Sequence, residues 1–254
     1  MALLPFSEYG SGNDVLVLLH GYGADRHLFR PLIPRLDKRF RLIVPDLRGH
    51  GEAKNIREPF RFEQFAADVI ETLDSLNIQR FNLMGYSMGG FISQVIFRTY
   101  PEKVQQLVLG CTSSFKNDSL YERTVEKRGL PVLIKLIGIK NFSKLVFSGS
   151  AGGKPLDPES LKQFKAVLAG NDQDNIIAIG AEIFRFDNRP FLKQIKVPTL
   201  VLGAQKDLIV PFRHSRYLAE NIPNAKLHVF QDAGHGAIFT HRIEMADAIL
   251  AFFK

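Results

Sequence analysis

Apolar runs of strand length alternate with amphipathic stretches along the first part of the chain. The runs cover residues 14–20, 40–45, 81–84 and 104–110, and residues 2–8 hold a further short strand candidate. Continuous apolar runs are typical of strands that are covered on both faces. Between them, apolar residues at a period of three to four predict helices over about 27–36, over 62–76 and from Phe91 onward. The alternation predicts an α/β fold, with a mostly parallel sheet flanked by helices.

This alternation breaks between residues 114 and 188, where no clear strand is predicted. Helical patterns cover 130–140, 141–147, 158–168 and 176–184, and a turn is expected at 148–155. The pattern then resumes with strands at 197–203 and 225–230 and helices at 213–221 and 242–253. We therefore expect one core from residues 1–113 and 189–254, with a helical insertion at 114–188 that packs over the sheet edge.

The pentapeptide from Gly85 to Gly89, Gly-Tyr-Ser-Met-Gly, lies between a predicted strand and a predicted helix. A strand that turns into a helix within one residue strains that residue, and flanking glycines let the two elements approach closely. Such a turn would expose the hydroxyl of Ser87 and direct the amide of Met88 toward the same space. Either Ser87 is a nucleophile or it is a serine in a Gly-rich connection, and the flanking elements favour the nucleophile.

A serine nucleophile needs a base and an acid that orients the base. Functional loops of parallel sheets gather beyond the carboxyl ends of the strands, so both groups are expected directly after strands. Asp207 follows the strand at 197–203 and His235 follows the strand at 225–230. Asp232 is the main alternative to Asp207.

Three further polar residues lie near ends of predicted strands. We expect His20 to support its own loop and Asp46 to brace the loop that follows it, while His50 is a weaker candidate for a substrate contact. A serine mechanism also needs two backbone N–H groups for the oxyanion. Met88 is expected to supply one, and Tyr22, between Gly21 and Gly23, the other, although that loop is also compatible with a plain βα connection.

Composition narrows the class of protein further. The chain has 254 residues, of which 45% are hydrophobic and 23% charged, and its formal net charge is +7. The basic residues are spread along the chain and no nucleic-acid motif is found, so nucleic acid is not an expected partner. A single cysteine, Cys111, and the absence of a signal-like start or a membrane-length apolar run predict a cytoplasmic protein without a membrane partner. No cofactor or metal motif is present.

Five motifs occur in an order that resembles the α/β-hydrolase superfamily, in particular its small capped serine esterase and lactonase-like branch. They are His20-Gly21-Tyr22-Gly23, Asp46-Leu47-Arg48-Gly49-His50-Gly51, Gly85-Tyr86-Ser87-Met88-Gly89-Gly90, Gly203-Ala204-Gln205-Lys206-Asp207 and Gly234-His235-Gly236. The resemblance covers nearly the whole chain. It implies that Ser87 is the nucleophile, His235 the base and Asp207 the orienting acid, with Tyr22 and Met88 as oxyanion donors and 114–188 as a helical cap.

The resemblance implies a serine hydrolase that cleaves a carboxylic ester or a related acyl bond through an acyl-enzyme. A serine at position 87, rather than an aspartate, argues against dehalogenase and epoxide hydrolase chemistry, and the absence of tryptophan argues against haloperoxidase relatives. Two alternatives remain open. The same residues would serve a carbon–carbon bond hydrolase or a lactonase, and the loop from Gly21 to Asp25 resembles that of hydrolase-fold signalling regulators that bind a small ligand.

The predicted cap has both apolar and basic residues that bear on the substrate. The apolar ones would line an acyl pocket or pack the cap helices together, and they are Leu130, Val132, Leu133, Ile134, Leu136, Ile137, Phe142, Leu145 and Phe147. The basic ones are Arg123, Arg128, Lys135, Lys140, Lys144, Lys154, Lys162 and Lys165. They leave open an anionic or carrier-bound ester substrate, as in the pimeloyl-carrier-protein methyl ester esterases that the chain resembles.

Overall fold

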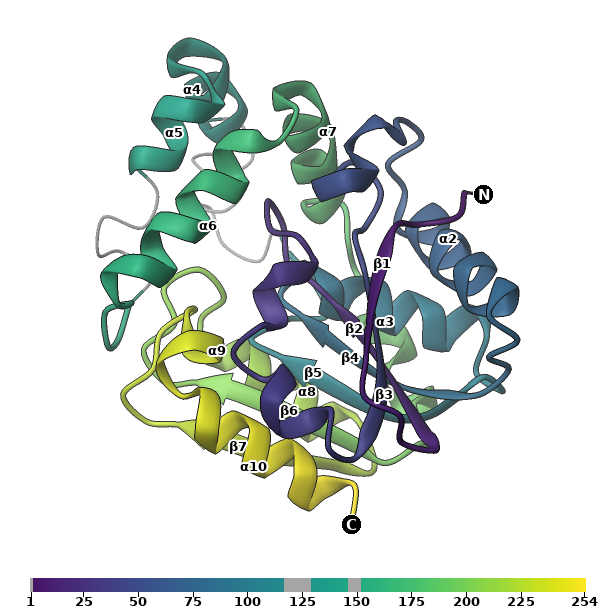
Figure 1. Ribbon diagram of the computed structural model, residues 1–254. Helices are drawn as coiled ribbons and strands as arrows, with labels where there is room; N and C mark the ends of the chain where they lie inside the picture. The colour runs from purple at the N-terminus through teal and green to yellow at the C-terminus, as the bar shows by residue number, and fades with distance from the viewer. Residues whose placement is uncertain (1, 117–128, 146–151) are drawn as a thin grey trace.

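A seven-stranded sheet forms the centre of the computed structural model, which describes residues 2–116, 129–145 and 152–254 (Figure 1). The strands are β1 (Phe6–Tyr9), β2 (Asp14–Leu19), β3 (Phe40–Pro45), β4 (Phe81–Tyr86), β5 (Val104–Gly110), β6 (Thr199–Ala204) and β7 (Ala225–Phe230). Their order across the sheet is β1-β3-β2-β4-β5-β6-β7. Strand β1 is antiparallel to β3 and every other pair is parallel. The predicted fold class is therefore confirmed.

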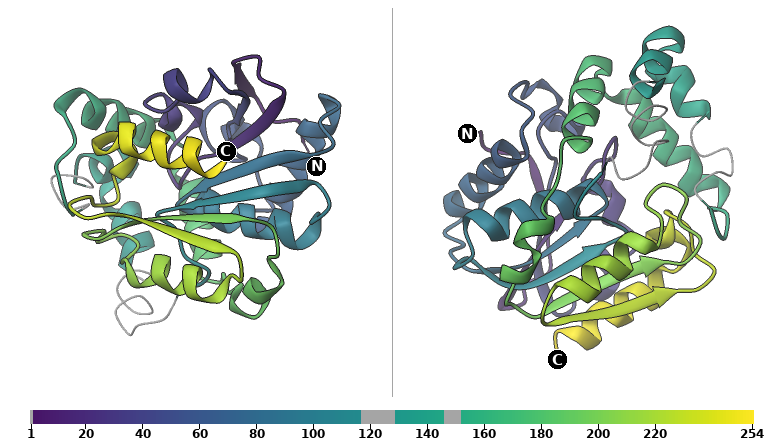
Figure 2. Two further views of the ribbon diagram at one scale, coloured as in Figure 1. Left: turned by 90° about the horizontal axis from the view of Figure 1, so that it is seen from below. Right: turned by 180° about the vertical axis from the view of Figure 1, so that it is seen from behind.

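Helices cover both faces of the sheet (Figure 2). One face packs against α2 (Phe62–Ser75), α3 (Met88–Thr99) and α8 (Arg213–Asn221), and the other against α1 (Ile33–Leu36), α9 (Ala237–Thr240) and α10 (Arg242–Phe252). In β2, Val17 and Leu19 face the first layer whereas Leu16 and Leu18 face the second. Successive strand residues point to opposite faces, so burial on both sides explains why these strands are continuously apolar.

Between β5 and β6 the described residues include four helices, α4 (Leu130–Ile137), α5 (Ile139–Leu145), α6 (Pro158–Gly170) and α7 (Gln173–Ile183), and we call this part of the chain the insertion. Figure 1 shows these helices gathered on one side of the sheet. Their own apolar cluster includes Ile134, Phe142 and Ile176. Side-chain hydrogen bonds join the insertion to the core: Asn171 Nδ2 donates to Gly23 O at 3.0 Å and Asn175 Nδ2 to Lys54 O at 2.8 Å.

Some predicted elements differ from those observed. The helix expected over 27–36 is wrong, because a 3-10 turn (Arg26–Phe29) and the short α1 replace it. Pro31 and Pro34 lie in this stretch, and proline interrupts a helix by removing a hydrogen-bond donor. The helix expected over 130–140 ends at Ile137, since Gly138 has a φ of +77°. Helix α9 was not predicted, and part of the turn expected at 148–155 lies outside the described residues.

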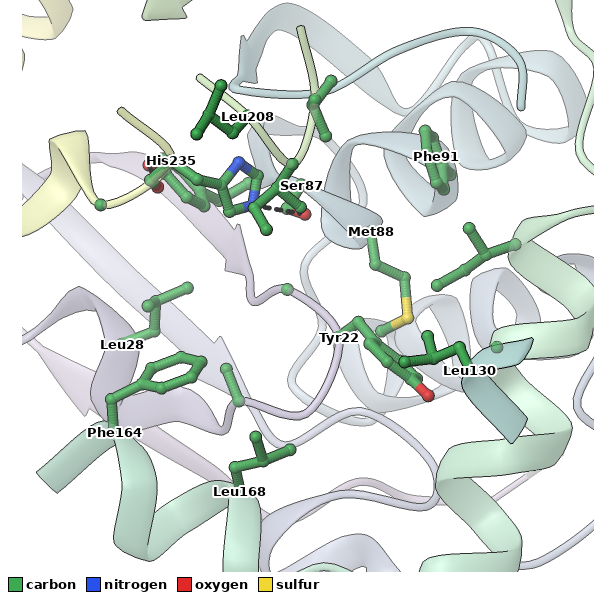
Figure 3. A pocket seen from close by; sticks show the side chains of 18 of the residues that line it. Tyr22, Leu28, Ser87, Met88, Phe91, Leu130, Phe164, Leu168, Leu208 and His235 are labelled. Carbon is green, nitrogen blue, oxygen red and sulfur yellow. Dashed lines mark hydrogen bonds between the residues drawn. The ribbon is translucent and has the colours of Figure 1, made fainter. Parts of the chain in front are cut away.

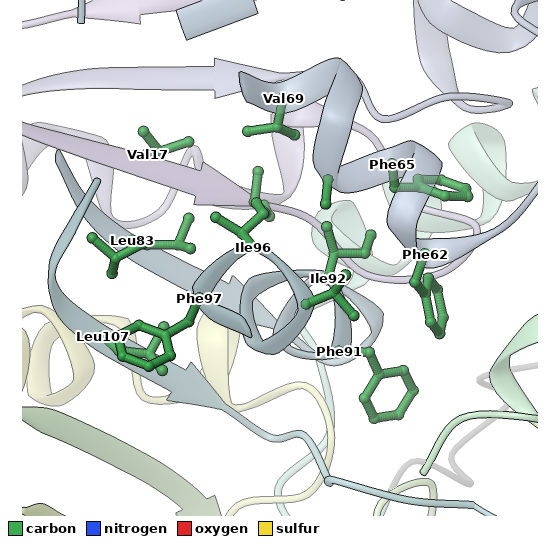
Figure 4. Packing of buried hydrophobic residues seen from close by; sticks show 14 of the residues in the cluster. Val17, Phe62, Phe65, Val69, Leu83, Phe91, Ile92, Ile96, Phe97 and Leu107 are labelled. Carbon is green, nitrogen blue, oxygen red and sulfur yellow. The ribbon is translucent and has the colours of Figure 1, made fainter. Parts of the chain in front are cut away.

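The packing between α3 and the sheet yields a stability prediction (Figure 4). Ile92 is fully buried in the layer between α2, α3 and the sheet. We expect Ile92→Ala to lower the free energy of unfolding by about 2–5 kcal/mol, because it removes buried methyl groups and leaves a cavity. Chemical denaturation would measure the change. The control is Ile243→Ala in α10, where the side chain is 56% exposed and the effect should stay within about 0.5 kcal/mol. Equal losses in the two variants would contradict the packing described here.

Candidate active site

Ser87 occupies the turn between β4 and α3 with a backbone φ of +54° and ψ of −120°. A β-carbon on Gly85 would lie 2.2 Å from Gly89 O, and one on Gly89 would lie 2.0 Å from Leu19 O. Neither position can accept a side chain, so the two glycines allow strand and helix to meet at a single residue. The unfavourable backbone of Ser87 is the consequence, and strain of this kind is typical of functional positions.

The side chains of Ser87, His235 and Asp207 form one hydrogen-bonded chain. Figure 3 shows the part of it that joins Ser87 to His235. His235 Nε2 lies 3.1 Å from Ser87 Oγ, and His235 Nδ1 lies 2.8 Å from Asp207 Oδ2. A carboxylate can only accept, so Nδ1 carries the proton and Nε2 is left to accept the serine hydroxyl proton. The structure thus brings together the three side chains that the sequence singled out.

Asp207 is held by backbone donors of its own loop. Its Oδ1 accepts hydrogen bonds from the N–H groups of Ile209 and Val210, both at 2.8 Å. The residue is only 4% exposed. These two bonds leave Oδ2 directed at His235, so the carboxylate position does not depend on solvent.

The side chain of Tyr86 holds the backbone of His235 in place. Its hydroxyl donates to His235 O at 2.6 Å. Burial raises the pKa of Tyr86 well above its ordinary value, so the phenol keeps the proton that this bond requires. Sequence reasoning missed this role, although Tyr86 lies inside the Gly-x-Ser-x-Gly turn, because the contact joins residues 149 positions apart.

The loop of Gly21 and Tyr22 lies against the serine. A β-carbon on Gly21 would be 3.2 Å from Ser87 Cβ. Gly21 O is held by His20 Nδ1 at 2.9 Å and by the N–H of Ala24 at 3.2 Å. In a trans peptide the C=O and the following N–H point in opposite directions, so this anchoring turns the Tyr22 N–H away from His20. The Tyr22 hydroxyl donates to Ile176 O in α7 at 2.6 Å, which ties the loop to the insertion.

Two buried histidines support this loop. The N–H of Leu47 donates to His20 Nε2 at 3.0 Å, and the N–H of Gly23 donates to His50 Nε2 at 3.1 Å. Burial lowers the pKa of His20 to about 4 and that of His50 to about 3, so both rings are neutral near pH 7. His50 is fully buried and is not among the residues that line the pocket, so the structure does not place it against a substrate.

The structure does not bring Asp232 to His235. Asp232 Oδ1 instead accepts from His241 Nε2 at 2.7 Å, and its side chain is 62% exposed. This hydrogen bond lowers the pKa of Asp232. Asp46 braces its loop as expected, since its carboxylate accepts from the backbone N–H groups of Arg26 and Glu52, both at 2.8 Å.

A stretch in the middle of the insertion, just before α6, contacts the loops that carry Asp207 and His235. Gly153 forms an isolated antiparallel bridge with Ala233, and the N–H of Lys154 donates to Asp232 O at 2.9 Å. Gly152 lies close to the loop that carries Asp207: a β-carbon on Gly152 would be 1.8 Å from Lys206 O. Residues 152–154 therefore lie beside two of the three loops that build the site.

A cavity of about 720 Å³ opens at Ser87 and His235 between the core loops and the insertion (Figure 3). Its lining is mostly apolar and includes Leu28, Phe91, Leu130, Phe164 and Leu168. Several of the predicted cap residues do not reach it: Val132 and Leu136 are exposed, and Ile134 packs within the insertion. Phe147 and the side chain of Leu145 lie outside the described residues. Lys116, which sequence reasoning did not single out, lines the cavity.

The remaining predicted features concern charge, metal and membrane. Lys135, Lys140, Lys144, Lys154 and Lys162 are exposed on the insertion, whereas Arg123 and Arg128 lie outside the described residues. Within residues 2–116, 129–145 and 152–254, no three His, Cys, Asp or Glu side chains are grouped closely enough to hold a metal ion. In the same part of the chain, no helix is both long and apolar enough to cross a bilayer.

A parallel sheet in this order, with a serine raised on a Gly-x-Ser-x-Gly turn, defines the α/β-hydrolase class. The chain belongs to this family, because residues 14–242 match the family model described as alpha/beta hydrolase fold. It is 30% identical to a pimeloyl-[acyl-carrier protein] methyl ester esterase of Neisseria meningitidis serogroup B over 93% of this chain and 90% of that relative.

Two further similar proteins show the range of names within the family. A 2-hydroxy-6-oxononadienedioate/2-hydroxy-6-oxononatrienedioate hydrolase of Escherichia coli is 26% identical over 97% of this chain and 89% of its own. The structure of a thermophilic esterase from Thermogutta terrifontis superposes with a TM-score of 0.88 at 26% identity, covering 98% of this chain and 92% of that one. The family is thus established, and the names of its members include esterases and a hydrolase that is named for a different substrate.

The neutral histidines predict a loss of stability in acid. Both have a folded-state pKa below the ordinary 6.5, so below that pH the unfolded chain binds protons that the folded chain does not. Stability should fall as pH drops from 6.5 toward 4, by about 1 kcal/mol per pH unit for each histidine. Denaturation at several pH values would compare the wild type with His50→Gln, which should show a shallower fall. Parallel curves for the two proteins would contradict a neutral buried His50.

Proposed function

We propose that the protein is a serine hydrolase of carboxylic esters, with Ser87 as nucleophile, His235 as base and Asp207 as the acid that orients it. The observation that carries this proposal is the hydrogen-bonded chain of these three side chains, which opens into a largely apolar cavity. Esterase names among the relatives support the same choice. The segment 114–188 then acts as the cap over the substrate.

The reaction would begin with attack of Ser87 Oγ on the ester carbonyl carbon while His235 Nε2 takes the hydroxyl proton. The tetrahedral intermediate collapses as His235 returns this proton to the leaving alcohol oxygen, which leaves an acyl group on Ser87. A water molecule then gives a proton to His235 and attacks the acyl carbon. Collapse of the second intermediate releases the carboxylic acid and restores the serine. The Asp207 carboxylate, hydrogen-bonded to His235 Nδ1, stabilises the imidazolium that forms in each half-reaction.

The negative oxygen of each intermediate needs fixed donors. We assign the backbone N–H groups of Tyr22 and Met88 to this role. Met88 is the first residue of α3, where N–H groups have no partner within the helix. Tyr22 follows the anchored carbonyl of Gly21, and its side chain is secured to α7. Both donors belong to backbone that is fixed before the substrate arrives, so they need not reorganise as charge develops.

Replacement of the nucleophile tests the mechanism. We expect Ser87→Ala to lower kcat for a p-nitrophenyl ester by about 10⁴-fold or more, because the remaining groups cannot form the acyl-enzyme. The unfolding midpoint should not fall, since the substitution removes only the hydrogen bond from the Ser87 hydroxyl to His235. The control is Ser75→Ala at the exposed end of α2, which should keep full activity.

A panel of esters, lactones and vinylogous diketones assayed with the same variants separates the alternatives. Fast turnover of a diketone but not of esters would replace the ester proposal with carbon–carbon bond hydrolysis. A single turnover that leaves the protein acylated would favour a ligand-binding regulator. Ester hydrolysis that survives in Ser87→Ala would rule out the mechanism altogether.

The apolar cavity predicts a preference for longer acyl chains. Each added CH₂ that enters it should raise kcat/KM by about threefold to fourfold, because burial of a methylene contributes about 0.8 kcal/mol. A series of p-nitrophenyl esters from acetyl to octanoyl would measure the slope. A flat or falling series between acetyl and hexanoyl would show that the acyl chain does not occupy this cavity.

A further inference from the structure

Lys116 lies at the junction between the core and the insertion. Its backbone N–H donates to Phe186 O at 3.2 Å, and the preceding residue, Phe115, forms an antiparallel bridge with Asp187. The backbone at Lys116 is therefore paired with residues 186–187, which follow α7. Its side chain lines the same cavity as Ser87 and His235.

The ammonium group of Lys116 is directed along the cavity wall. Its Nζ lies 5.9 Å from the centre of the Phe184 ring, a buried aromatic residue that also lines the cavity. A cation at this distance from a ring face is attracted by it, which favours one placement of the flexible side chain. The Phe184 ring thus restricts the position of the Lys116 ammonium group within the cavity.

The charge of Lys116 stands out against the rest of the lining. Among the described residues that border the cavity, Lys116 is the one lysine or arginine, and none is an aspartate or glutamate. A cation in apolar surroundings attracts an anion more strongly than it would in water. An ammonium group has three N–H donors, so Lys116 can donate a hydrogen bond to a carboxylate and still keep the interactions that it already makes. A wholly apolar substrate gains nothing from such a group.

We propose that Lys116 forms an anion subsite and that the preferred substrates are esters that carry a carboxylate. This inference rests on the proposed ester hydrolase function and specifies its substrate class. The carboxylate can belong to the acyl part, as in a monoester of a dicarboxylic acid, or to the alcohol part. Both sources present the same chemistry to the ammonium group.

Matched esters distinguish the two sources. For the acyl part, the mono-p-nitrophenyl ester of suberic acid is compared with p-nitrophenyl octanoate, which has the same chain length. For the alcohol part, 4-carboxyphenyl octanoate is compared with 4-carbamoylphenyl octanoate. Each is assayed with the wild type, Lys116→Met and Lys116→Arg. The control is Lys140→Met, which removes an exposed lysine of α5 that does not line the cavity.

We expect Lys116→Met to lower kcat/KM for one of the two carboxylate esters by about 10- to 100-fold, mainly through KM, because a hydrogen bond to a charged group is lost. Lys116→Arg should retain most of the preference, and the neutral esters should change less than about twofold. Equal losses for charged and neutral esters, or the same loss in Lys140→Met, would overturn the subsite.

A binding measurement keeps the subsite separate from the reaction. Calorimetry of suberate with Ser87→Ala should give binding that weakens by a similar factor when Lys116→Met is added. If the affinity for suberate is the same with and without Lys116→Met, the subsite is overturned, whereas the proposed ester hydrolysis is not affected by this result. If no ester is hydrolysed but suberate binding depends on Lys116, the proposed function fails and the subsite stands.

Discussion

The contact between β4, α3 and β2 leaves no space for a β-carbon at Gly85 or Gly89. Strand and helix meet so closely that a single residue connects them, and that residue must accept a positive φ. The backbone of three elements therefore sets the position of the Ser87 hydroxyl, rather than the side chains around it. The other parts of the site are arranged about this point. The Tyr86 hydroxyl holds the backbone of His235, backbone N–H groups hold Asp207, and the His20 ring holds the carbonyl of Gly21.

The order of strands and helices could be predicted because burial on both faces of a parallel sheet leaves a local pattern in the sequence. Ser87, Asp207 and His235 could be selected for a related reason: each follows a strand, and parallel strands end at the same edge. The helix over 27–36 was wrong because proline overrode the apolar spacing. Tyr86 and Lys116 were missed because their roles depend on contacts with loops distant in sequence, which no local pattern records.

The loop that presents Tyr22 is held by both parts of the molecule. Neutral His20 and His50 anchor it to the loop after β3, while Tyr22 and Asn171 connect it to the insertion. A loop of small residues would otherwise sample many backbone states, since glycine restricts the chain least. Anchoring on two sides fixes the Tyr22 amide, as the proposed stabilisation of an oxyanion would require.

Residues 152–154 change where the boundary of the insertion should be drawn for protein engineering. Their pairing with Ala233 and their close approach to Lys206 make them part of the backbone around Asp207 and His235. A chimera that exchanges the whole segment 114–188 for that of a relative would replace this pairing along with the pocket wall. An exchange that stops before Gly152 preserves it, so a change of specificity can be sought in the helices from α4 to α5 without rebuilding the hydrogen-bonded chain.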